Sequence, residues 1–204
     1  MAIKPILFNT EMVRAILDGR KTCTRRTLKH PFIVHPNGYI TKPRGNENLC
    51  PYDPPYQPGD ILYARETWTE ECGKYYYRAD YDSDYLDPCE TLSGGYPASC
   101  RNHPGCDGCM ATSTRIHWHP SIHMPKEAAR IWLKVTDVRV ERLQDMTDDD
   151  AEAEGCFDYT STALGFPDVW DSTIKKSDLD RYGWDASPWV WVIEFERCEK
   201  PETL

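Results

Sequence analysis

Lys21 and Thr24 stand in the sequence GRKTCTRR, which covers residues 19–26 and directly follows a short amphipathic segment. A threonine hydroxyl becomes a nucleophile when a base removes its proton, and a desolvated lysine can serve as that base. The two residues are three apart, so on an ideal strand their side chains face opposite sides. They converge only if the chain bends just after Gly19. The motif therefore raises the hypothesis of a catalytic pair, with a solvated run of charges as the alternative.

The elements that must position this pair are predicted by hydrophobic spacing. Residues 4–8 (KPILF) predict a strand. Asn9 or Thr10 can cap a helix that ends at Gly19 and whose apolar stripe consists of Met12, Val13, Ile16 and Leu17. The residues that follow this helix, 21–29, alternate and should be extended. Lys21 and Thr24 are therefore expected at a corner between a helix and a strand.

Further elements follow from the same reasoning. We expect a long Pro- and Gly-rich loop over 31–58, strands over 61–68, 129–143 and 187–197, and a short helix between an N-cap at Thr147 and a stop at Gly155. The pattern of residues 61–68 does not decide which face of this strand is buried, so either Arg65 or Glu66 points away from solvent. Many strands, two or three short helices and no βαβ rhythm predict an α+β fold, namely a small, partly closed β-barrel with short helices at its ends.

Composition narrows the class of protein. The 204 residues carry a formal net charge of −9 and are 40% hydrophobic, which fits a folded domain and argues against a protein that coats long nucleic acid. A short RNA or a small ligand is still compatible with a local basic patch, which consists of Arg14, Arg20, Lys21, Arg25, Arg26 and Lys29.

The expected compartment follows from the apolar runs and the cysteines. No stretch approaches 18 apolar residues, so we expect no membrane span, and the apolar run in residues 1–12 is too short for a signal peptide. We therefore expect a cytoplasmic protein whose nine cysteines are reduced or bound to metal.

Residues 71–118 interrupt the strand pattern and form a Cys-rich insertion. Four cysteines, with a CxxC pair at the end, have the spacing of a structural zinc site: Cys89, Cys100, Cys106 and Cys109. His103 or Cys72 can replace one of these ligands, and a set of reduced thiols is the alternative. A site closed by four cysteines leaves no position for water, so this zinc would serve folding, and we expect no catalytic metal.

Four segments together resemble the ASCH domain, a relative of PUA-like barrels: ILDGRKTCTRR, GDILYARETW, MTDDDAEAEG and WVWVIEFER. The resemblance is closest to the ASCH proteins of phages and prophages. It covers about residues 3–28, 56–70 and 120–197. It implies a single PUA-like domain over residues 1–204, with the Cys-rich insertion 71–118 within it.

One branch of that family, the bacterial 4-acetylcytidine amidohydrolases, implies roles for three residues. By this resemblance Thr24 is the nucleophile, Lys21 the proton acceptor and Glu154, at the end of the acidic helix, the proton donor. Glu66 in ARETW is the alternative carboxylate. We also expect a set of substrate-binding residues, namely Arg20, Arg25, Arg26, Arg65 and Glu66. A structural ion-pair network is the alternative for four of them: Arg25, Arg26, Arg65 and Glu66.

Three functions are compatible with the sequence. The first is hydrolysis of an amide on a modified, acetylcytidine-like nucleoside or a short RNA. The second is a non-catalytic RNA- or nucleotide-binding module, in which cations hold phosphate and Tyr and Trp rings stack on bases. The third is a phage accessory protein that binds a host partner through the Cys-rich insertion.

Overall fold

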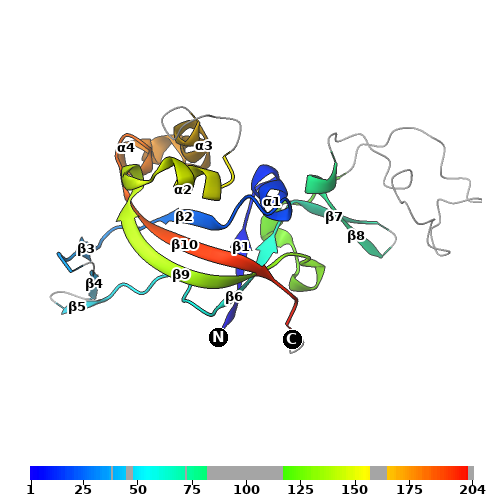
Figure 1. The fold of residues 1–204 in the computed structure, drawn as a ribbon, viewed down its shortest axis with the longest axis horizontal. Coiled ribbons are helices and arrows are strands. Elements are labelled where there is room, and N and C mark those ends of the chain that lie inside the picture. The colour runs from blue at the N-terminus through cyan, green and yellow to red at the C-terminus, as the bar shows by residue number, and fades with distance from the viewer. Residues whose placement is uncertain (38, 45–47, 72, 82–116, 157–164, 202–204) are drawn as a thin grey trace, which may run out of the picture. The chain divides into compact units, whose positions relative to one another are not determined.

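The computed structural model describes residues 1–37, 39–44, 48–71, 73–81, 117–156 and 165–201 (Figure 1). These residues form mostly strands with a few short helices, so the predicted α+β class is confirmed. Within the described part, no helix is long and apolar enough to cross a bilayer.

The strands are β1 (Ile3–Leu7), β2 (Cys23–Thr27), β3 (Ile33–Val34), β4 (Ile40–Arg44), β5 (Asn48–Pro51), β6 (Ile61–Arg65), β7 (Trp68–Glu71), β8 (Lys74–Tyr77), β9 (Trp132–Arg142) and β10 (Trp189–Cys198). The α-helices are α1 (Thr10–Leu17), α2 (Asp148–Ala153), α3 (Phe166–Thr173) and α4 (Leu179–Tyr182). Single 3₁₀ turns cover Arg78–Asp80, Ser121–His123, Lys126–Ala128, Leu143–Asp145 and Lys176–Asp178.

The chain divides into two compact units. Unit 1 contains Met1–Lys4, Ala15–Leu62 and Trp132–Leu204, and unit 2 contains Pro5–Arg14 and Tyr63–Ile131. The candidate residues Lys21, Thr24 and Glu154 all belong to unit 1.

The largest sheet has the strand order β1-β6-β9-β10-β2. Strand β10 is antiparallel to both of its neighbours, and its Val192 lies opposite Arg25 of β2 and Arg139 of β9. Figure 1 shows β9 and β10 as two long curved strands side by side. Since β1 and β2 are the two edges, the sheet is open, and no closed barrel is found among the described residues.

The helices α2 and α3 cover one face of the sheet in unit 1, on the same side of β2 and β10 in Figure 1. They bury an apolar cluster that consists of Leu143, Met146, Ala151, Phe166, Trp170, Val190 and Val192. Helix α3 follows Gly165 and carries Pro167 in its first turn, which suits the fixed φ of proline. Phe166 and Trp170, one turn apart, supply its buried face.

Residues 31–58 differ from the irregular loop that their composition predicts. They contain a three-stranded antiparallel sheet in the order β3-β4-β5, in which Val34 lies opposite Ile40 and Thr41 opposite Pro51. Burial of Ile40 and Thr41 stabilises β4 despite its Pro and Lys residues. The prediction of a loop was therefore wrong here, because packing outweighed local composition.

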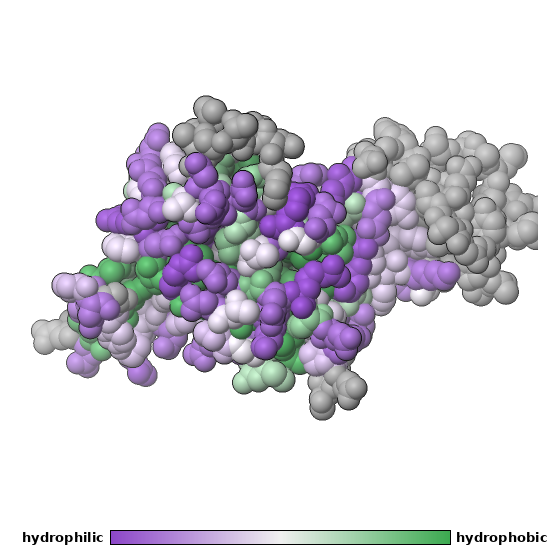
Figure 2. All heavy atoms as spheres, viewed as in Figure 1, coloured by the Kyte–Doolittle hydropathy of each residue, from purple (hydrophilic) through white to green (hydrophobic). Residues whose placement is uncertain are grey.

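The surface of unit 1 is uneven in polarity. Figure 2 shows mostly hydrophilic residues over the outer side of the α2–α4 region and hydrophobic residues at the surface between that region and the β3–β5 sheet. Two side chains of the β3–β5 sheet are about half exposed, Ile33 at 46% and Leu49 at 52%.

Candidate functional site

The end of α1 fixes the backbone at Lys21. Gly19 adopts φ +76°, a left-handed conformation that favours glycine. The chain then folds back, and the backbone N–H groups of Arg20 and Lys21 both donate to the carbonyl of Ala15, at 2.9 and 3.0 Å. The predicted corner after Gly19 is therefore formed.

Helix α2 brings Glu154 to the same corner. The helix begins with a capping box in which Thr147 and Asp150 satisfy each other's backbone N–H groups. It ends at Glu154, and the N–H of Thr22 donates to the carbonyl of Ala153 at 2.8 Å. The last turn of α2 is thereby joined to the residues that lead into β2.

Gly155 permits the close approach of these two segments. It adopts φ +91°, and a Cβ at this position would lie 2.7 Å from Cβ of Ala15 and 3.3 Å from Cβ of Lys21. Any other residue would meet both backbone strain and a clash. Glycine is required here by its conformation and by its size.

Lys21 and Glu154 form a buried ion pair. The Lys21 Nζ donates to Glu154 Oε2 at 2.5 Å and to the Glu154 carbonyl at 2.9 Å. The two side chains are 1% and 6% exposed. The structure therefore brings together two of the three residues that the family resemblance singled out, across 133 positions of sequence.

Arg25 completes the centre of this cluster. Its guanidinium lies 2.7 Å from Glu141 Oε1, 3.0 Å from Asp150 Oδ1 and 3.4 Å from Glu154 Oε1, and its side chain is 0% exposed. Burial acts to lower the pKa of Arg25, but the carboxylates of Glu154 and Glu141 outweigh it and raise that pKa. We call Lys21, Arg25, Glu141, Asp150 and Glu154 the ionic centre.

Arg139 balances the charge of the ionic centre. It lies 3.4 Å from Glu141 and 3.7 Å from Asp150, and it also pairs with Glu194. Lys21, Arg25 and Arg139 are thus three cations that pair with the three carboxylates of the ionic centre. Buried charges that are paired in this way avoid most of the cost of leaving water.

Cys23 lies between Lys21 and Thr24 in sequence but is not a nucleophile. It is buried, and burial together with the charge of Glu154 raises the pKa of its thiol to about 12. The thiolate is the reactive form of cysteine, so this thiol is inert near neutral pH.

The two faces of β2 separate the predicted residues. Successive side chains of a strand point to opposite faces, so Arg25 lies on one face and Thr24 and Arg26 on the other. Arg25 pairs across the sheet with Val192, which belongs to the apolar cluster under α2. Thr24 therefore lies on the face of β2 opposite to Arg25, and the described hydrogen bonds of the ionic centre do not include its hydroxyl.

The face of β2 that carries Thr24 also carries a cation and aromatic rings. Arg26 is exposed, yet neighbouring protein lowers the pKa of its guanidinium by partial desolvation. Burial raises the pKa of Tyr56, and the charge of Arg26 opposes that rise, so the two groups are close. Trp191 lies opposite Arg26 on β10 and contacts Tyr52 edge to face, with ring centroids 6.1 Å apart.

Arg20 and Arg65 take different places. Arg20 pairs with Asp18 at 2.9 Å and donates to the carbonyl of Gly155 at 3.3 Å, so it borders the ionic centre. Arg65 belongs to unit 2, where its Nη1 donates to the carbonyl of Ile122 at 3.2 Å and its guanidinium lies 5.6 Å from the ring centroid of Tyr63.

Glu66, the alternative carboxylate, is a buried ion-pair partner in unit 2. It is 1% exposed, which decides between the two alternations left open for this strand. Arg130 binds both of its oxygens, at 2.9 and 3.0 Å, and stacks 4.0 Å over the ring of Tyr77. Burial raises the pKa of Glu66 although Arg130 opposes that rise.

The predicted zinc ligands Cys89, Cys100, Cys106 and Cys109 lie outside the described residues, as do their possible substitutes His103 and Cys72. In the part of the chain that is described, the cysteines are free, and no group of three or more His, Cys, Asp or Glu side chains is arranged to hold a metal ion. The zinc site stays a prediction.

Sequence reasoning missed Glu141 and Asp150 of the ionic centre, and it missed Arg139, which pairs with both of them. Arg139 and Glu141 are two apart on β9, so strand alternation does predict that they share a face. This face meets Arg25 because β10 pairs with both β2 and β9, and no local sequence pattern predicts that pairing.

Comparisons with models of known families, with curated proteins and with solved structures found no match to this chain.

Proposed function

We propose that this chain is an ASCH-like protein with a PUA-like fold that binds a nucleoside or a short RNA on the Thr24 face of β2. The observation that supports this proposal is the exposure of Arg26 beside aromatic residues on the face shared with Thr24. An aromatic ring can stack on a base, and a guanidinium can bind a phosphate or the carbonyl edge of a base. The short ligand suits a chain of net charge −9.

The ionic centre supports this face and does not itself bind the ligand. A phosphate could contact Arg25 only by displacing carboxylates from a guanidinium that is 0% exposed. The buried pairs instead join β2 to α2 and β9, which holds the opposite face of β2 in a defined position. This is a positioning role for Lys21, Arg25 and Glu154.

Binding can be tested with cytidine, N4-acetylcytidine, cytidine monophosphate and a short labelled RNA, by calorimetry and fluorescence anisotropy. Arg26→Gln should weaken binding of phosphate-bearing ligands about tenfold or more, because one charged contact is lost. Arg197→Gln removes the same charge from an exposed site on β10 and should leave affinity unchanged. Equal affinity of Arg26→Gln and the parent chain would refute the site.

Hydrolysis is the second candidate, favoured by the contact between Lys21 and Glu154. In that reaction Thr24 Oγ1 would attack the acyl carbon and pass its proton to Lys21, and Glu154 would protonate the departing amine of the base. Water would then release the acid from Thr24. The reaction requires a state in which Thr24 and Lys21 meet on one side of β2.

A turnover assay separates the two candidates. If the chain hydrolyses N-acylated cytidines, Thr24→Ala should abolish turnover and leave ligand affinity nearly intact, because the hydroxyl acts mainly in the transition state. If the chain only binds, the parent protein releases no acid from any acylated nucleoside. The binding affinity of the parent chain is the control in both cases.

We further propose that the Cys-rich insertion 71–118 holds one structural zinc. The support is the ligand spacing of Cys89, Cys100, Cys106 and Cys109, in a segment with few apolar residues to fold without metal. Elemental analysis of protein purified without chelator should find one zinc per chain. Joint Cys106→Ser and Cys109→Ser substitution should remove it and lower the melting temperature. A metal-free parent protein would contradict the proposal.

A further inference from the structure

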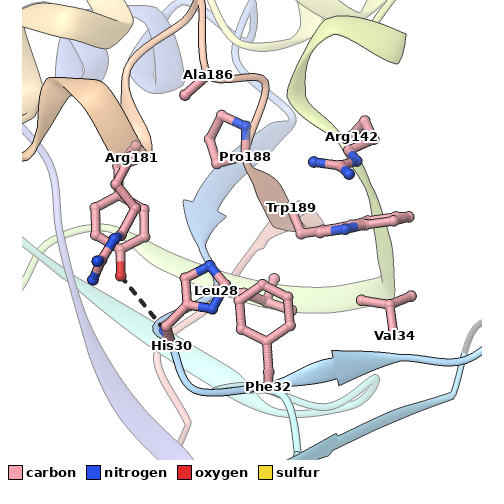
Figure 3. Close-up of a pocket in the computed structure, with 10 residues that line it drawn as sticks. Leu28, His30, Phe32, Val34, Arg142, Arg181, Ala186, Pro188 and Trp189 are labelled. Atoms are coloured by element: carbon pink, nitrogen blue, oxygen red, sulfur yellow. Dashed lines mark hydrogen bonds between the residues drawn. The ribbon is translucent and has the colours of Figure 1, made fainter.

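A cleft in unit 1 has the composition of a nucleic-acid site (Figure 3). Its volume is about 510 Å³, within the range of about 300–1,000 Å³ typical of ligand pockets. Its wall is built from the segment after β2, from β3, from the end of β9, from α4 and from the start of β10. Its principal side chains are His30, Phe32, Val34, Arg142, Arg181 and Trp189.

The cleft is basic although the chain is acidic. The sequence contains 33 Asp and Glu against 24 Lys and Arg, yet no acidic residue lines the cleft, and Arg142 and Arg181 do. In the described residues neither arginine has a carboxylate within ion-pair distance. Arg142 is held by one hydrogen bond, 2.9 Å from its Nη1 to the carbonyl of Ser187, which leaves most of its donors directed to solvent. This local charge suits an anionic ligand.

The rings of the cleft are arranged to receive a flat group. The Arg142 guanidinium lies 4.7 Å from the ring centroid of Trp189. Figure 3 shows Arg142 on one side of the Trp189 indole and Phe32 with Val34 on the other. His30 stacks on Phe32 with ring centroids 4.2 Å apart. Figure 3 shows the Trp189 indole edge-on and the Phe32 ring turned toward the viewer, so a planar base could stack on one of these rings and contact the other with its edge.

The backbone around the cleft is held before any ligand arrives. The N–H of Leu28 donates to the carbonyl of Trp189 at 3.0 Å, which continues the pairing of β2 with β10. The N–H of His30 donates to the hydroxyl of Tyr182 at 3.4 Å, as drawn in Figure 3. A preformed site loses less conformational entropy on binding.

The cleft continues past Trp189. A second cavity of about 420 Å³ shares Trp189 and Val34 with the first and is otherwise lined by His35, Pro36 and Val140. In the other direction, Leu28 lies two residues after Arg26, roughly 7 Å along an extended chain. The surface is therefore longer than one nucleotide requires.

We propose that this cleft binds a base and the adjoining phosphates of a single-stranded polynucleotide, with the base against Trp189 and Phe32 and the phosphates on Arg142 and Arg181. The ligand class is then a strand of several nucleotides rather than a free nucleoside. This inference rests on the proposed function and deepens it. Base and phosphate are common to RNA and DNA, so the experiment includes both.

Anisotropy of labelled oligouridylate and oligothymidylate can test the proposal, at salt concentrations from about 50 to 200 mM. Phe32→Ala should weaken binding by roughly 5- to 100-fold, because stacking on one base is lost. Arg142→Gln and Arg181→Gln should each weaken binding and reduce the slope of log affinity against log salt by about 0.7. Arg197→Gln, outside the cleft, should change neither quantity. Trp189→Phe should retain binding that Trp189→Leu loses, and the melting temperature of each variant verifies its fold.

The outcomes separate this inference from the proposed function. Loss of RNA binding, DNA binding or both in the cleft variants supports the cleft, and the pattern identifies its natural strand. Cleft variants that bind oligonucleotides like the parent chain, while Arg26→Gln loses binding, would overturn the cleft and leave the proposed function standing. A parent chain that binds neither oligonucleotides nor nucleosides would overturn both.

Discussion

The Lys21 ammonium lies 2.5 Å from the Glu154 carboxylate, and both side chains are almost fully withdrawn from solvent. The pair joins the residues before β2 to the last turn of α2. Because Arg25 reaches the other oxygen of Glu154, this carboxylate holds two cations at once. A lysine and a glutamate that resemble a catalytic pair can therefore have a structural role, which is to hold α2 against the residues that lead into β2.

The first prediction concerns the strength of this pair. Lys21→Met or Glu154→Leu alone should destabilise the protein by about 3–5 kcal/mol, since each leaves a buried charge without its main partner. The double variant should recover most of that loss, because two apolar side chains of similar size replace both charges. Urea unfolding of all four proteins measures the coupling.

Arg20→Met is the matched control, because the pair of Arg20 and Asp18 is partly exposed. It should cost less than about 1 kcal/mol. If the losses from Lys21→Met and Glu154→Leu simply add, with no recovery in the double variant, the two side chains do not stabilise each other and the prediction is wrong.

The second prediction compares two glycines with positive φ. Gly155→Ala should destabilise unit 1 by about 2–5 kcal/mol, because strain of the left-handed backbone adds to a clash with Ala15. Gly19→Ala has similar backbone strain but open space around its Cβ, so it should cost only about 1–2 kcal/mol. Melting temperatures and urea midpoints of the two variants test this order. Equal losses would show that the approach at Gly155 is not tight.

The third prediction concerns thiol chemistry. With a pKa of about 12, Cys23 has only about one thiolate in ten thousand thiols at pH 8. Iodoacetamide should therefore label the half-buried Cys50 long before Cys23 in the folded protein. Mass spectrometry of the tryptic peptide 22–25 measures the rate. In denaturant the two cysteines should react alike, and fast labelling of native Cys23 would contradict its burial.

The fourth prediction concerns acid stability. Burial acts to raise the pKa of Asp150, but hydrogen bonds from Thr147 and the charge of Arg25 outweigh it, so its folded pKa lies below its ordinary value. A lowered folded pKa means that the stabilisation is complete above the unfolded pKa, near 4, and is lost as the pH falls through the folded pKa.

Asp150→Asn should accordingly cost about 1–2 kcal/mol at pH 7, and the difference from the parent chain should shrink below about pH 4. Urea unfolding at a series of pH values follows this change. Asp149→Asn, an exposed neighbour in the same turn, should have a far smaller effect at every pH. A pH-independent loss for Asp150→Asn would assign its role to packing alone.

Local sequence signals determined several elements of this protein. Asn9 caps α1 through the N–H of Met12, Gly19 ends the turn after it, and a capping box begins α2 at Thr147, as the residue types predict. These features depend on neighbours within four residues, so composition and spacing suffice to find them. The contact of Lys21 with Glu154 was expected only from the family resemblance, because no periodicity links residues 133 positions apart.

Tertiary structure alone decided what each face of a strand does. Alternation predicts that Thr24 and Arg25 point to opposite sides, but only the packed structure shows that both are buried and that the face of Arg25 lies under α2. The same reasoning applies to Glu66, whose burial depends on Arg130 from another segment. Burial is a property of packed surfaces, and a sequence pattern specifies which residues share a face without specifying what will cover it.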